Sequence, residues 1–262
     1  MRLIVNADDF GLTLGVSRAI LKGMKDGIVT DTSALVTAPG FEGSVVLARE
    51  AGIGEMGLHV LLTVGHPALP AAQVPTLVNE QGRFYTRPQF LEHNISLSEV
   101  EAEIEAQILR LEQSGLRLNH IDCHHGLMNA TQGMRDLFID LAVRHGVPLR
   151  NEASRYCPLE IQRQYLERGV RMPEHFYLNH HGVPTHKVEH IQAHLSQARE
   201  QYELVEIGCH PGYNDGELEE LSPLNQDREI EMSVVMDQEL KRWIQDEKIN
   251  LVSFGEAFEE VQ

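Results

Sequence analysis

The sequence predicts an α/β protein whose mostly parallel sheet of seven or eight strands closes in a barrel-like way. Short apolar runs alternate with helical patterns along the chain, and repeated strand–helix units place parallel strands beneath covering helices. The length of 262 residues fits one such barrel, which commonly takes about 250 residues. The sequence has no glycine-rich nucleotide motif that would favour an open sheet instead.

The pattern is most regular over the first 62 residues. The run Leu3–Val5 predicts a strand that stops at Asp8, and apolar residues at helical spacing over 15–27 predict a helix. The same criteria predict a strand over 32–37, a helix over 41–50 and a strand over 56–62.

Residues 63–95 interrupt this rhythm. The segment holds four prolines and a turn-like stretch at 79–82, and it is too long for an ordinary connection. We therefore expect one domain, 1–262, in which 63–95 forms a loop or lid inserted over the site.

The second half of the chain repeats the pattern less regularly. A capping-box sequence, Ser98-Glu99-Val100-Glu101, precedes apolar residues at helical spacing that end near Gly115. No element is assigned to 151–185. In chain order we further expect strands over 118–123, 148–150, 204–208 and 249–254, and helices over 134–143, 186–201 and 230–244.

Charge and cysteine content exclude several classes of protein. The formal net charge of −17 argues against nucleic acid and against an anionic membrane surface as partners. Cys123, Cys157 and Cys209 form no CxxC pair, which favours a reducing cytoplasm over a disulfide framework. The N-terminus does not resemble a signal peptide, and no apolar run has the length of a membrane span.

Four short segments end hydrophobic runs with residues that bind metals or move protons. Strand ends of an α/β protein converge on one rim, so segments far apart in sequence can build one site. Together they supply two adjacent carboxylates and several imidazoles, the groups of a hydrolytic metal centre. The segments are Asn6–Gly11, Gly57–His59, His120–His125 and Gly208–Pro211.

The two adjacent carboxylates are Asp8 and Asp9. In a regular strand they would face opposite ways, so both reach one site only if the chain turns there, and Gly11 makes a turn plausible. One carboxylate could then bind a metal while the other acts as a base. The alternative is a helix N-cap, because a predicted helix follows.

The segment around residue 122 is the strongest local signal. His120, Asp122 and His124 alternate and would share one face of a strand, whereas His125 would point away unless the strand has already ended. A metal held by His124, with Asp122 and His120 behind it, would satisfy this polar face. A buried polar network without a metal is the alternative.

Three further residues have weaker signals. His59 ends a strand and suits a metal ligand, although a lone histidine in an apolar run is more often a core or surface residue with its hydrogen bonds satisfied. His210, between Cys209 and Pro211, is a residue type that moves protons near pH 7. Arg150 ends a short predicted strand and could pair with an active-site carboxylate, or lie on the surface.

Taken together and in this order, the segments resemble the YdjC-like carbohydrate deacetylases, also called chitooligosaccharide or chitin-disaccharide deacetylases. The resemblance covers most of the chain. It departs from the family pattern at Gly126, where members often carry the third of three consecutive histidines. It runs through Leu3–Gly11, Gly27–Thr30, Gly57–His59, His120–His125 and Cys209–Pro211.

The resemblance implies a distorted, TIM-barrel-like (β/α) barrel. It implies an enzyme that uses a divalent metal to remove acetyl groups from N-acetylglucosamine units of short chitooligosaccharides such as diacetylchitobiose. In this sequence Asp9, His59 and His124 match the metal ligands, Asp8 the catalytic base and His210 the general acid. Another metal-dependent hydrolase, such as a phosphoesterase, and a non-catalytic sugar-binding protein remain alternatives.

The identity of the metal has two readings. Two histidines and a carboxylate suit Zn²⁺, Mn²⁺, Co²⁺ or Fe²⁺, whereas Mg²⁺ prefers oxygen ligands. The family resemblance nevertheless implies Mg²⁺. A small oligosaccharide is the expected partner, and a homodimer is expected because it is the commonest assembly.

Overall fold

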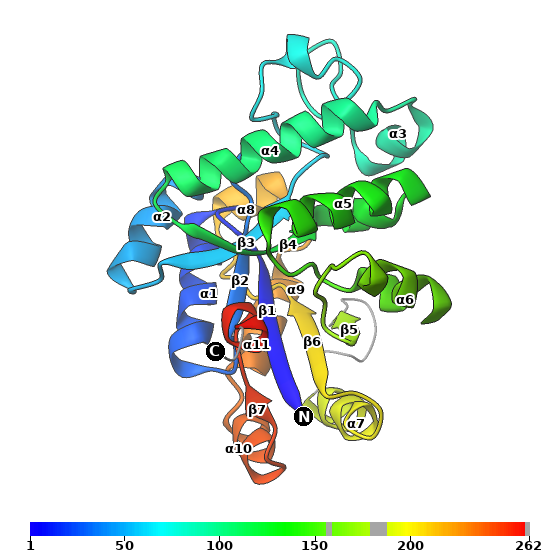
Figure 1. Ribbon diagram of the computed structural model, residues 1–262. Coiled ribbons are helices and arrows are strands. Elements are labelled where there is room, and N and C mark those ends of the chain that lie inside the picture. The colour runs from blue at the N-terminus through cyan, green and yellow to red at the C-terminus, as the bar shows by residue number, and fades with distance from the viewer. Residues whose placement is uncertain (156–158, 179–187, 260–262) are drawn as a thin grey trace.

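A sheet of parallel strands, wrapped by helices, forms the centre of the molecule (Figure 1). The computed structural model describes residues 1–155, 159–178 and 188–259. Its seven strands run in the order β4-β3-β2-β1-β6-β5, with β7 paired to β1, which confirms the predicted α/β class and strand number. The strands are β1 (Arg2–Phe10), β2 (Asp31–Ala34), β3 (Glu55–Val60), β4 (Arg117–Cys123), β5 (His175–Leu178), β6 (Leu204–Cys209) and β7 (Asn250–Leu251).

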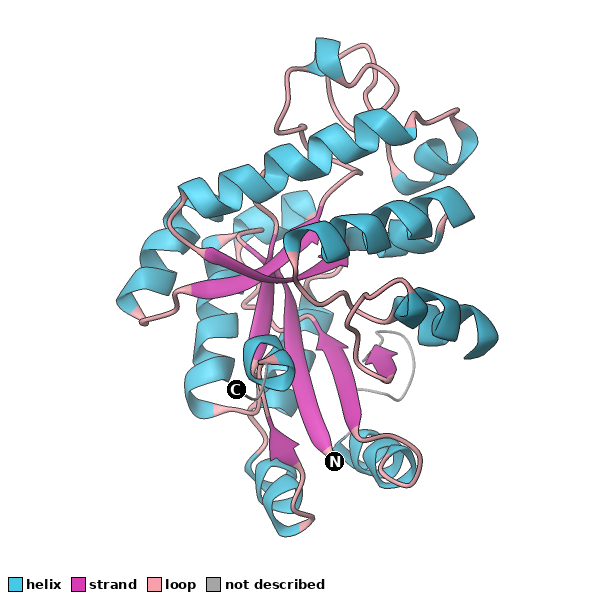
Figure 2. Cartoon of the chain, in the orientation of Figure 1, coloured by secondary structure: helices cyan, strands magenta, loops and turns pink. Residues whose placement is uncertain are grey.

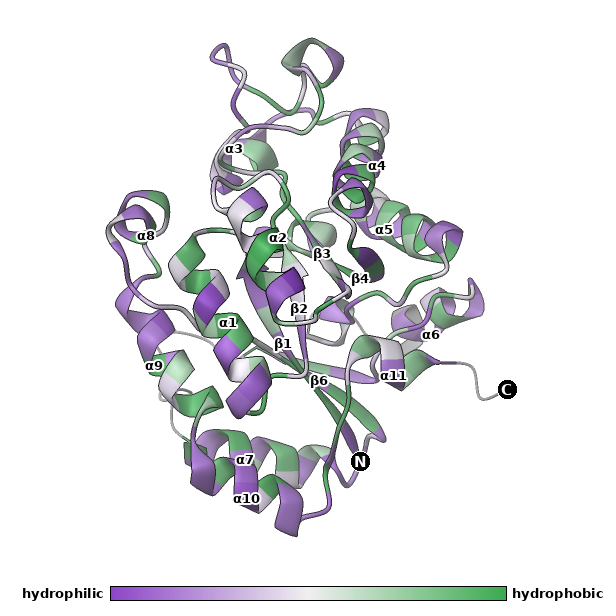
Figure 3. Cartoon of the chain, turned by 90° about the vertical axis from the view of Figure 1, so that its left-hand side faces the viewer, coloured by the Kyte–Doolittle hydropathy of each residue, from purple (hydrophilic) through white to green (hydrophobic). Residues whose placement is uncertain are grey.

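Helices cover the outer face of this curved sheet (Figure 2). Hydrophilic and hydrophobic residues alternate along them, as expected of helices with one face on a sheet (Figure 3). None of the helices in the described part of the chain has the length and apolar character of a membrane span. They are α1 (Leu14–Asp26), α2 (Phe41–Glu50), α3 (Arg87–Glu92), α4 (Leu97–Gln113), α5 (Gln132–His145), α6 (Leu159–Glu167), α7 (Val188–Ala198), α8 (Gly216–Leu221), α9 (Gln226–Val235), α10 (Gln238–Asp246) and α11 (Phe254–Phe258).

The barrel is incompletely closed between its edge strands β4 and β5. The stretch 148–150, predicted as a strand, forms only an isolated parallel bridge between Leu149 and Ile121. Its backbone nevertheless forms hydrogen bonds with two different segments, β4 and the stretch around residue 171. Arg150 N donates to Ile121 O of β4 at 3.0 Å, and Leu149 N donates to Arg171 O at 2.9 Å. A short bridging segment therefore stands where a regular barrel would have another strand.

The inner face of the sheet is polar. Residues that are in register on neighbouring parallel strands point to the same face. Asn6 of β1 is in register with Asp31 of β2, and His59 of β3 with Asp122 of β4. This register gathers side chains from β1 to β4 on one surface, where they form the wall of the candidate site.

An apolar cluster closes the barrel at the N-terminal ends of the strands. Ile4 and Leu204 lie near the starts of β1 and β6 and pack with Val252 and with two residues of α11, Phe254 and Ala257. All five side chains are buried. The polar inner face therefore opens toward the C-terminal ends of the strands.

Carboxylates of α4 hold the 63–95 segment in place. Glu103 is fully buried and accepts hydrogen bonds from the backbone N–H groups of Ala68 (2.7 Å) and Leu69 (3.0 Å). Glu99 accepts from both the backbone and the hydroxyl of Thr76. The segment also contains the 3₁₀ turn Ala71–Gln73 and α3, so it is an ordered part of the structure.

Two sequence predictions near the C-terminus were wrong. The helix expected over 230–244 is two helices, α9 and α10. The backbone is extended at Asp237, which is the N-cap of α10 and accepts a hydrogen bond from Leu240 N at 2.7 Å. The strand expected over 249–254 is only two residues long. Ser253 and Glu256 form a capping box there that starts α11.

Smaller differences concern the ends of elements. α4 starts at Leu97 with Ser96 as its N-cap, so the capping-box pattern at 98–101 lies inside the first turn. β5 and α6 lie in the stretch left unassigned. The first two residues of the helix expected over 186–201, and Cys157, lie outside the described residues.

Gly57 of β3 allows His120 to pack inside the barrel. A Cβ at position 57 would overlap the His120 imidazole, so we expect Gly57→Ala to lower the free energy of unfolding by about 1–3 kcal/mol, the usual cost of overpacking. Gly54→Ala is the matched control, since a Cβ there meets nothing within 4 Å. Equal denaturant midpoints for the two variants would contradict this packing argument.

Candidate metal centre

A bulge in β1 brings both adjacent carboxylates to the same site. The register between β1 and β2 shifts between Ala7 and Phe10, and Asp9 has a left-handed backbone with φ 70°. An extra residue of this kind lets consecutive side chains reach one face. The turn expected from Gly11 thus occurs at Asp9 itself, one of the few residue types that tolerate this conformation.

Asp9 lies between two histidines. Its Oδ1 is 3.4 Å from His59 Nε2 and 3.0 Å from His124 Nδ1, and these three ligand atoms form a group that could hold a metal ion. Asp9 Oδ1 is buried and accepts no conventional hydrogen bond. Its other oxygen, Oδ2, accepts from Arg228 Nη2 at 2.6 Å. One carboxylate oxygen and two ring nitrogens are atom types that ligate divalent cations such as Zn²⁺.

A second carboxylate orients His59. Its Nδ1 is 2.8 Å from Asp122 Oδ1, and Ser33 Oγ donates to Asp122 Oδ2 at 2.8 Å. An N–H at Nδ1 leaves the Nε2 lone pair directed at Asp9 and available to a cation. Burial alone would lower the pKa of His59, but Asp122 and Asp8 outweigh it and raise the pKa to about 9. A cation bound at Nε2 would displace that proton.

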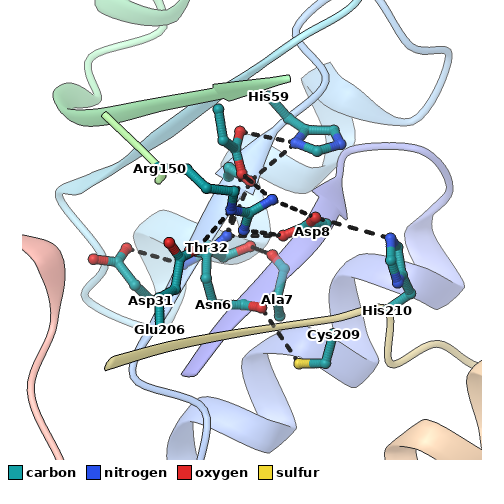
Figure 4. Close-up of polar contacts among 12 residues, drawn as sticks. Asn6, Ala7, Asp8, Asp31, Thr32, His59, Arg150, Glu206, Cys209 and His210 are labelled. Atoms are coloured by element: carbon teal, nitrogen blue, oxygen red, sulfur yellow. Dashed lines mark hydrogen bonds and ion pairs between the residues drawn. The ribbon is translucent and has the colours of Figure 1, made fainter. Parts of the chain in front are cut away.

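Arg150 joins three carboxylates on the inner face (Figure 4). Its two Nη atoms donate to the two oxygens of Asp8, each at 2.7 Å, and Nη1 is 2.9 Å from Asp122 Oδ2. Nε donates to Glu206 at 2.6 Å. Burial tends to raise the pKa of Asp8, but Arg150 and His59 hold it below its ordinary value. Asp8 therefore stays ionised, whereas burial raises the pKa of Glu206 to about 8 despite Arg150.

His210 approaches Asp8 from the side opposite Arg150 (Figure 4). Its Nε2 is 3.8 Å from Asp8 Oδ2, and its Nδ1 is 3.9 Å from Glu231 Oε1. Glu231 of α9 also accepts from the backbone N–H of His210 at 2.6 Å. Burial lowers the pKa of His210 to about 4 and raises that of Glu231 to about 8. These shifts favour the neutral form of both side chains, and the facing atoms, His210 Nδ1 and Glu231 Oε1, are buried without a hydrogen-bond partner among the described residues.

The structure does not bring every predicted site residue into the cluster. His120 lies deeper in the barrel, where its ring stacks on Phe254 with centroids 3.9 Å apart. His125 lies beside His124, with ring centroids 3.9 Å apart, and its Nδ1 is 2.9 Å from Thr63 Oγ1. Its backbone is left-handed, with φ 60°, so the strand has ended before this residue.

Sequence reasoning missed three charged residues of the site. Glu206 had a visible signal, because it is a lone charge in an otherwise apolar strand. Arg228 and Glu231 had none: both lie on a polar helix, three residues apart, and only the tertiary fold turns that face toward Asp9 and His210.

Removing the buried guanidinium should strongly destabilise the fold. Arg150→Met leaves two ionised carboxylates without their partner, and breaking such a buried pair costs about 3–5 kcal/mol. Arg144→Met is the control, because Arg144 is half exposed and pairs with Glu101 and Glu105 on the surface, where a pair contributes about 0–1 kcal/mol. Urea unfolding measures the free energy of unfolding of both variants. Similar decreases in the two would contradict the importance of the buried Arg150 pairs.

Asp122→Asn should weaken metal binding although Asp122 is not one of the three proposed ligands. The amide no longer favours the His59 tautomer that presents Nε2, and loss of such an orienting group costs about 10–100-fold in affinity. Competition with a chromophoric chelator measures the metal affinity of each variant. The exposed carboxylate variant Asp140→Asn serves as control, and an unchanged affinity in Asp122→Asn would argue against this role.

Known protein sequences resemble this chain over nearly its whole length. The YdjC-like protein family matches residues 2–246. A carbohydrate deacetylase of Brevibacillus brevis is 34% identical over 258 residues, which cover 98% of this chain and 99% of that protein. A carbohydrate deacetylase of Enterococcus faecalis is also 34% identical over 258 residues, covering 97% of each.

Two solved structures resemble this chain over nearly its whole length. A crystal structure from Enterococcus faecalis, named for cellobiose-phosphate cleavage, matches with a TM-score of 0.88 and 34% identity over 97% of both chains. The lactam utilization protein of Thermus thermophilus matches with a TM-score of 0.54 and 16% identity, over 97% of this chain and 100% of that one. The second likeness is one of fold alone.

Proposed function

The chain belongs to the YdjC-like protein family, and on that premise we propose that it is a metal-dependent carbohydrate deacetylase. Its substrates would be short chitooligosaccharides such as diacetylchitobiose, from whose N-acetylglucosamine units it would remove acetyl groups. One observation carries the proposal: a triangle of side chains that could hold a metal ion, Asp9, His59 and His124, borders a carboxylate and an imidazole, Asp8 and His210, of the types that move protons. The names of the curated relatives support the same activity.

The three residues of the triangle would hold one divalent cation. The buried, unbonded Oδ1 of Asp9 and the two nearby ring nitrogens fit such an ion. When bound, the cation would lower the pKa of a water and polarise the acetamide carbonyl. Two nitrogen donors favour Zn²⁺, Mn²⁺, Co²⁺ or Fe²⁺, whereas the family resemblance favours Mg²⁺.

Asp8 would act as the general base. Its carboxylate is ionised and fixed by Arg150 and Asn6, the amide of which donates to Asp8 Oδ1 at 2.9 Å. Arg150 also makes Asp8 a weak base, because it stabilises the charged form. A weak base suffices only for a water that is already acidic, so the role of Asp8 is coupled to an occupied metal centre.

His210 would protonate the leaving amine. In the resting state its ring is neutral, and the proton resides on Glu231. As the amine leaves, Nε2–H would donate its proton to the amine nitrogen. Nδ1 would take the proton of Glu231 once these two atoms, 3.9 Å apart in the resting structure, close to hydrogen-bond distance. His210 would then end the step neutral and Glu231 as a carboxylate. Glu231 would then be a positioning and proton-holding partner of His210.

The remaining features of the proposal follow the sequence expectations. Residues 1–262 would form one deacetylase domain, with 63–95 bordering the site. The protein would act in the cytoplasm on a small oligosaccharide and would assemble as a homodimer.

Acetate release from diacetylchitobiose tests the proposal directly. The metal-stripped protein should be inactive, and restoring individual divalent cations should recover turnover and rank the metals. Asp8→Asn should retain bound metal but lower kcat by about 10²–10⁴, the usual contribution of a positioned base. Turnover in the stripped protein, or near-wild-type turnover in Asp8→Asn, would overturn the mechanism.

A further inference from the structure

Two residues of the 63–95 segment, Thr63 at its start and Arg87 in its second half, contact one residue of the loop that carries His124. Thr63, just after β3, places its Oγ1 2.9 Å from His125 Nδ1. Arg87, the first residue of α3, donates from Nε to the backbone oxygen of His125 at 3.0 Å. His125 directly follows His124, so the segment is attached one residue away from the metal centre. We call these three residues the Thr63–His125–Arg87 clamp.

The backbone around the clamp is strained. His125 and Val64 have φ values of 60° and 61°, and a β-branched residue such as Val64 rarely adopts this left-handed conformation. In the described part of the chain, four non-glycine residues have positive φ, and three of them, Asp9, Val64 and His125, lie at the metal centre or in direct sequence contact with the clamp. Such strain persists only where surrounding contacts hold it, and it concentrates at binding sites.

Arg87 has hydrogen-bond donors left over. Its Nε is used by His125, but within the described residues Nη1 and Nη2 make neither a hydrogen bond nor an ion pair. The buried arginines of the site, Arg150 and Arg228, are instead paired with carboxylates. Arg87 is exposed, so its planar fork of N–H groups is available to oxygen acceptors of a ligand.

The position of these donors indicates which part of a ligand they meet. The acetamide would bind at the Asp9, His59 and His124 triangle. Arg87 bonds to the backbone of His125, whose exposed ring lies against that of His124 with centroids 3.9 Å apart, so Arg87 lies beside the triangle and is not part of it. The Nε bond to the His125 backbone oxygen holds the guanidinium at this position before any ligand arrives.

We propose that Arg87, held by the clamp, is a specificity-determining residue that binds hydroxyl groups of the sugar unit adjoining the one that is deacetylated. This inference rests on the proposed function and deepens it. It assigns a subsite for a second sugar unit to the 63–95 segment. A disaccharide would gain the Arg87 contacts, and a monosaccharide would not.

The ratio of kcat/KM for diacetylchitobiose to that for N-acetylglucosamine tests the subsite, with acetate release as the readout. Arg87→Ala should lower this ratio about tenfold or more, since two hydrogen bonds from a charged donor are lost. The ratio for Arg87→Lys should lie between those of the wild type and Arg87→Ala, because an ammonium keeps the charge but lacks the planar fork of N–H groups. Arg83→Ala is the control: Arg83 is an exposed arginine of the same segment, and its side chain makes neither a hydrogen bond nor an ion pair with the described residues.

If Arg87 had only a structural role, the Arg87→Ala substitution would disturb the loop that carries His124 and would lower kcat/KM for both sugars by the same factor. An unchanged ratio in Arg87→Ala would therefore overturn the inference. If the wild-type protein releases acetate from neither sugar, the proposed function fails, and calorimetric affinity for diacetylchitobiose then decides the subsite. Weaker binding by Arg87→Ala than by Arg83→Ala would support it, and equal binding would overturn it.

Discussion

The contacts of one buried guanidinium determine both the interior of the barrel and the chemistry at its rim. Arg150 is almost fully buried and reaches carboxylates on three different strands, Asp8, Asp122 and Glu206. Ionised carboxylates are costly to bury without a partner of opposite charge. The inner face of the sheet can therefore be polar because Arg150, supplied by the segment that bridges β4 toward β5, compensates it.

A chain of contacts leads from Arg150 to the proposed metal centre. Arg150 fixes Asp122, Asp122 fixes the ring of His59, and His59 faces Asp9. Arg228 fixes Asp9 from the other side and leaves one oxygen free. The three proposed ligands are thus oriented by neighbours on sheet and helix before an ion binds, which is the preorganisation that a tight metal site needs.

Local pattern was sufficient for the strand–helix order and for the rim where the chemistry gathers, because both follow from apolar periodicity and parallel topology. Local pattern was insufficient where a single backbone angle, or a helix far away in the sequence, determines which side chains reach the site. The sequence indicated a turn at Gly11, but the positive φ of Asp9 makes both carboxylates converge. Arg228 and Glu231 look like ordinary surface residues of a polar helix until the fold places them against residues more than 20 positions away.

The apolar cluster around α11 determines from which end of the barrel a substrate would enter and a product would leave. Ile4, Leu204 and Phe254 close the barrel at the start of its strands, so the polar side chains of its inner face are reached from the C-terminal ends of the strands. In the proposed reaction, a saccharide would enter and acetate would leave at that end. The deacetylated sugar would then have to depart before the next substrate enters, and accumulated product would compete with fresh substrate for the site.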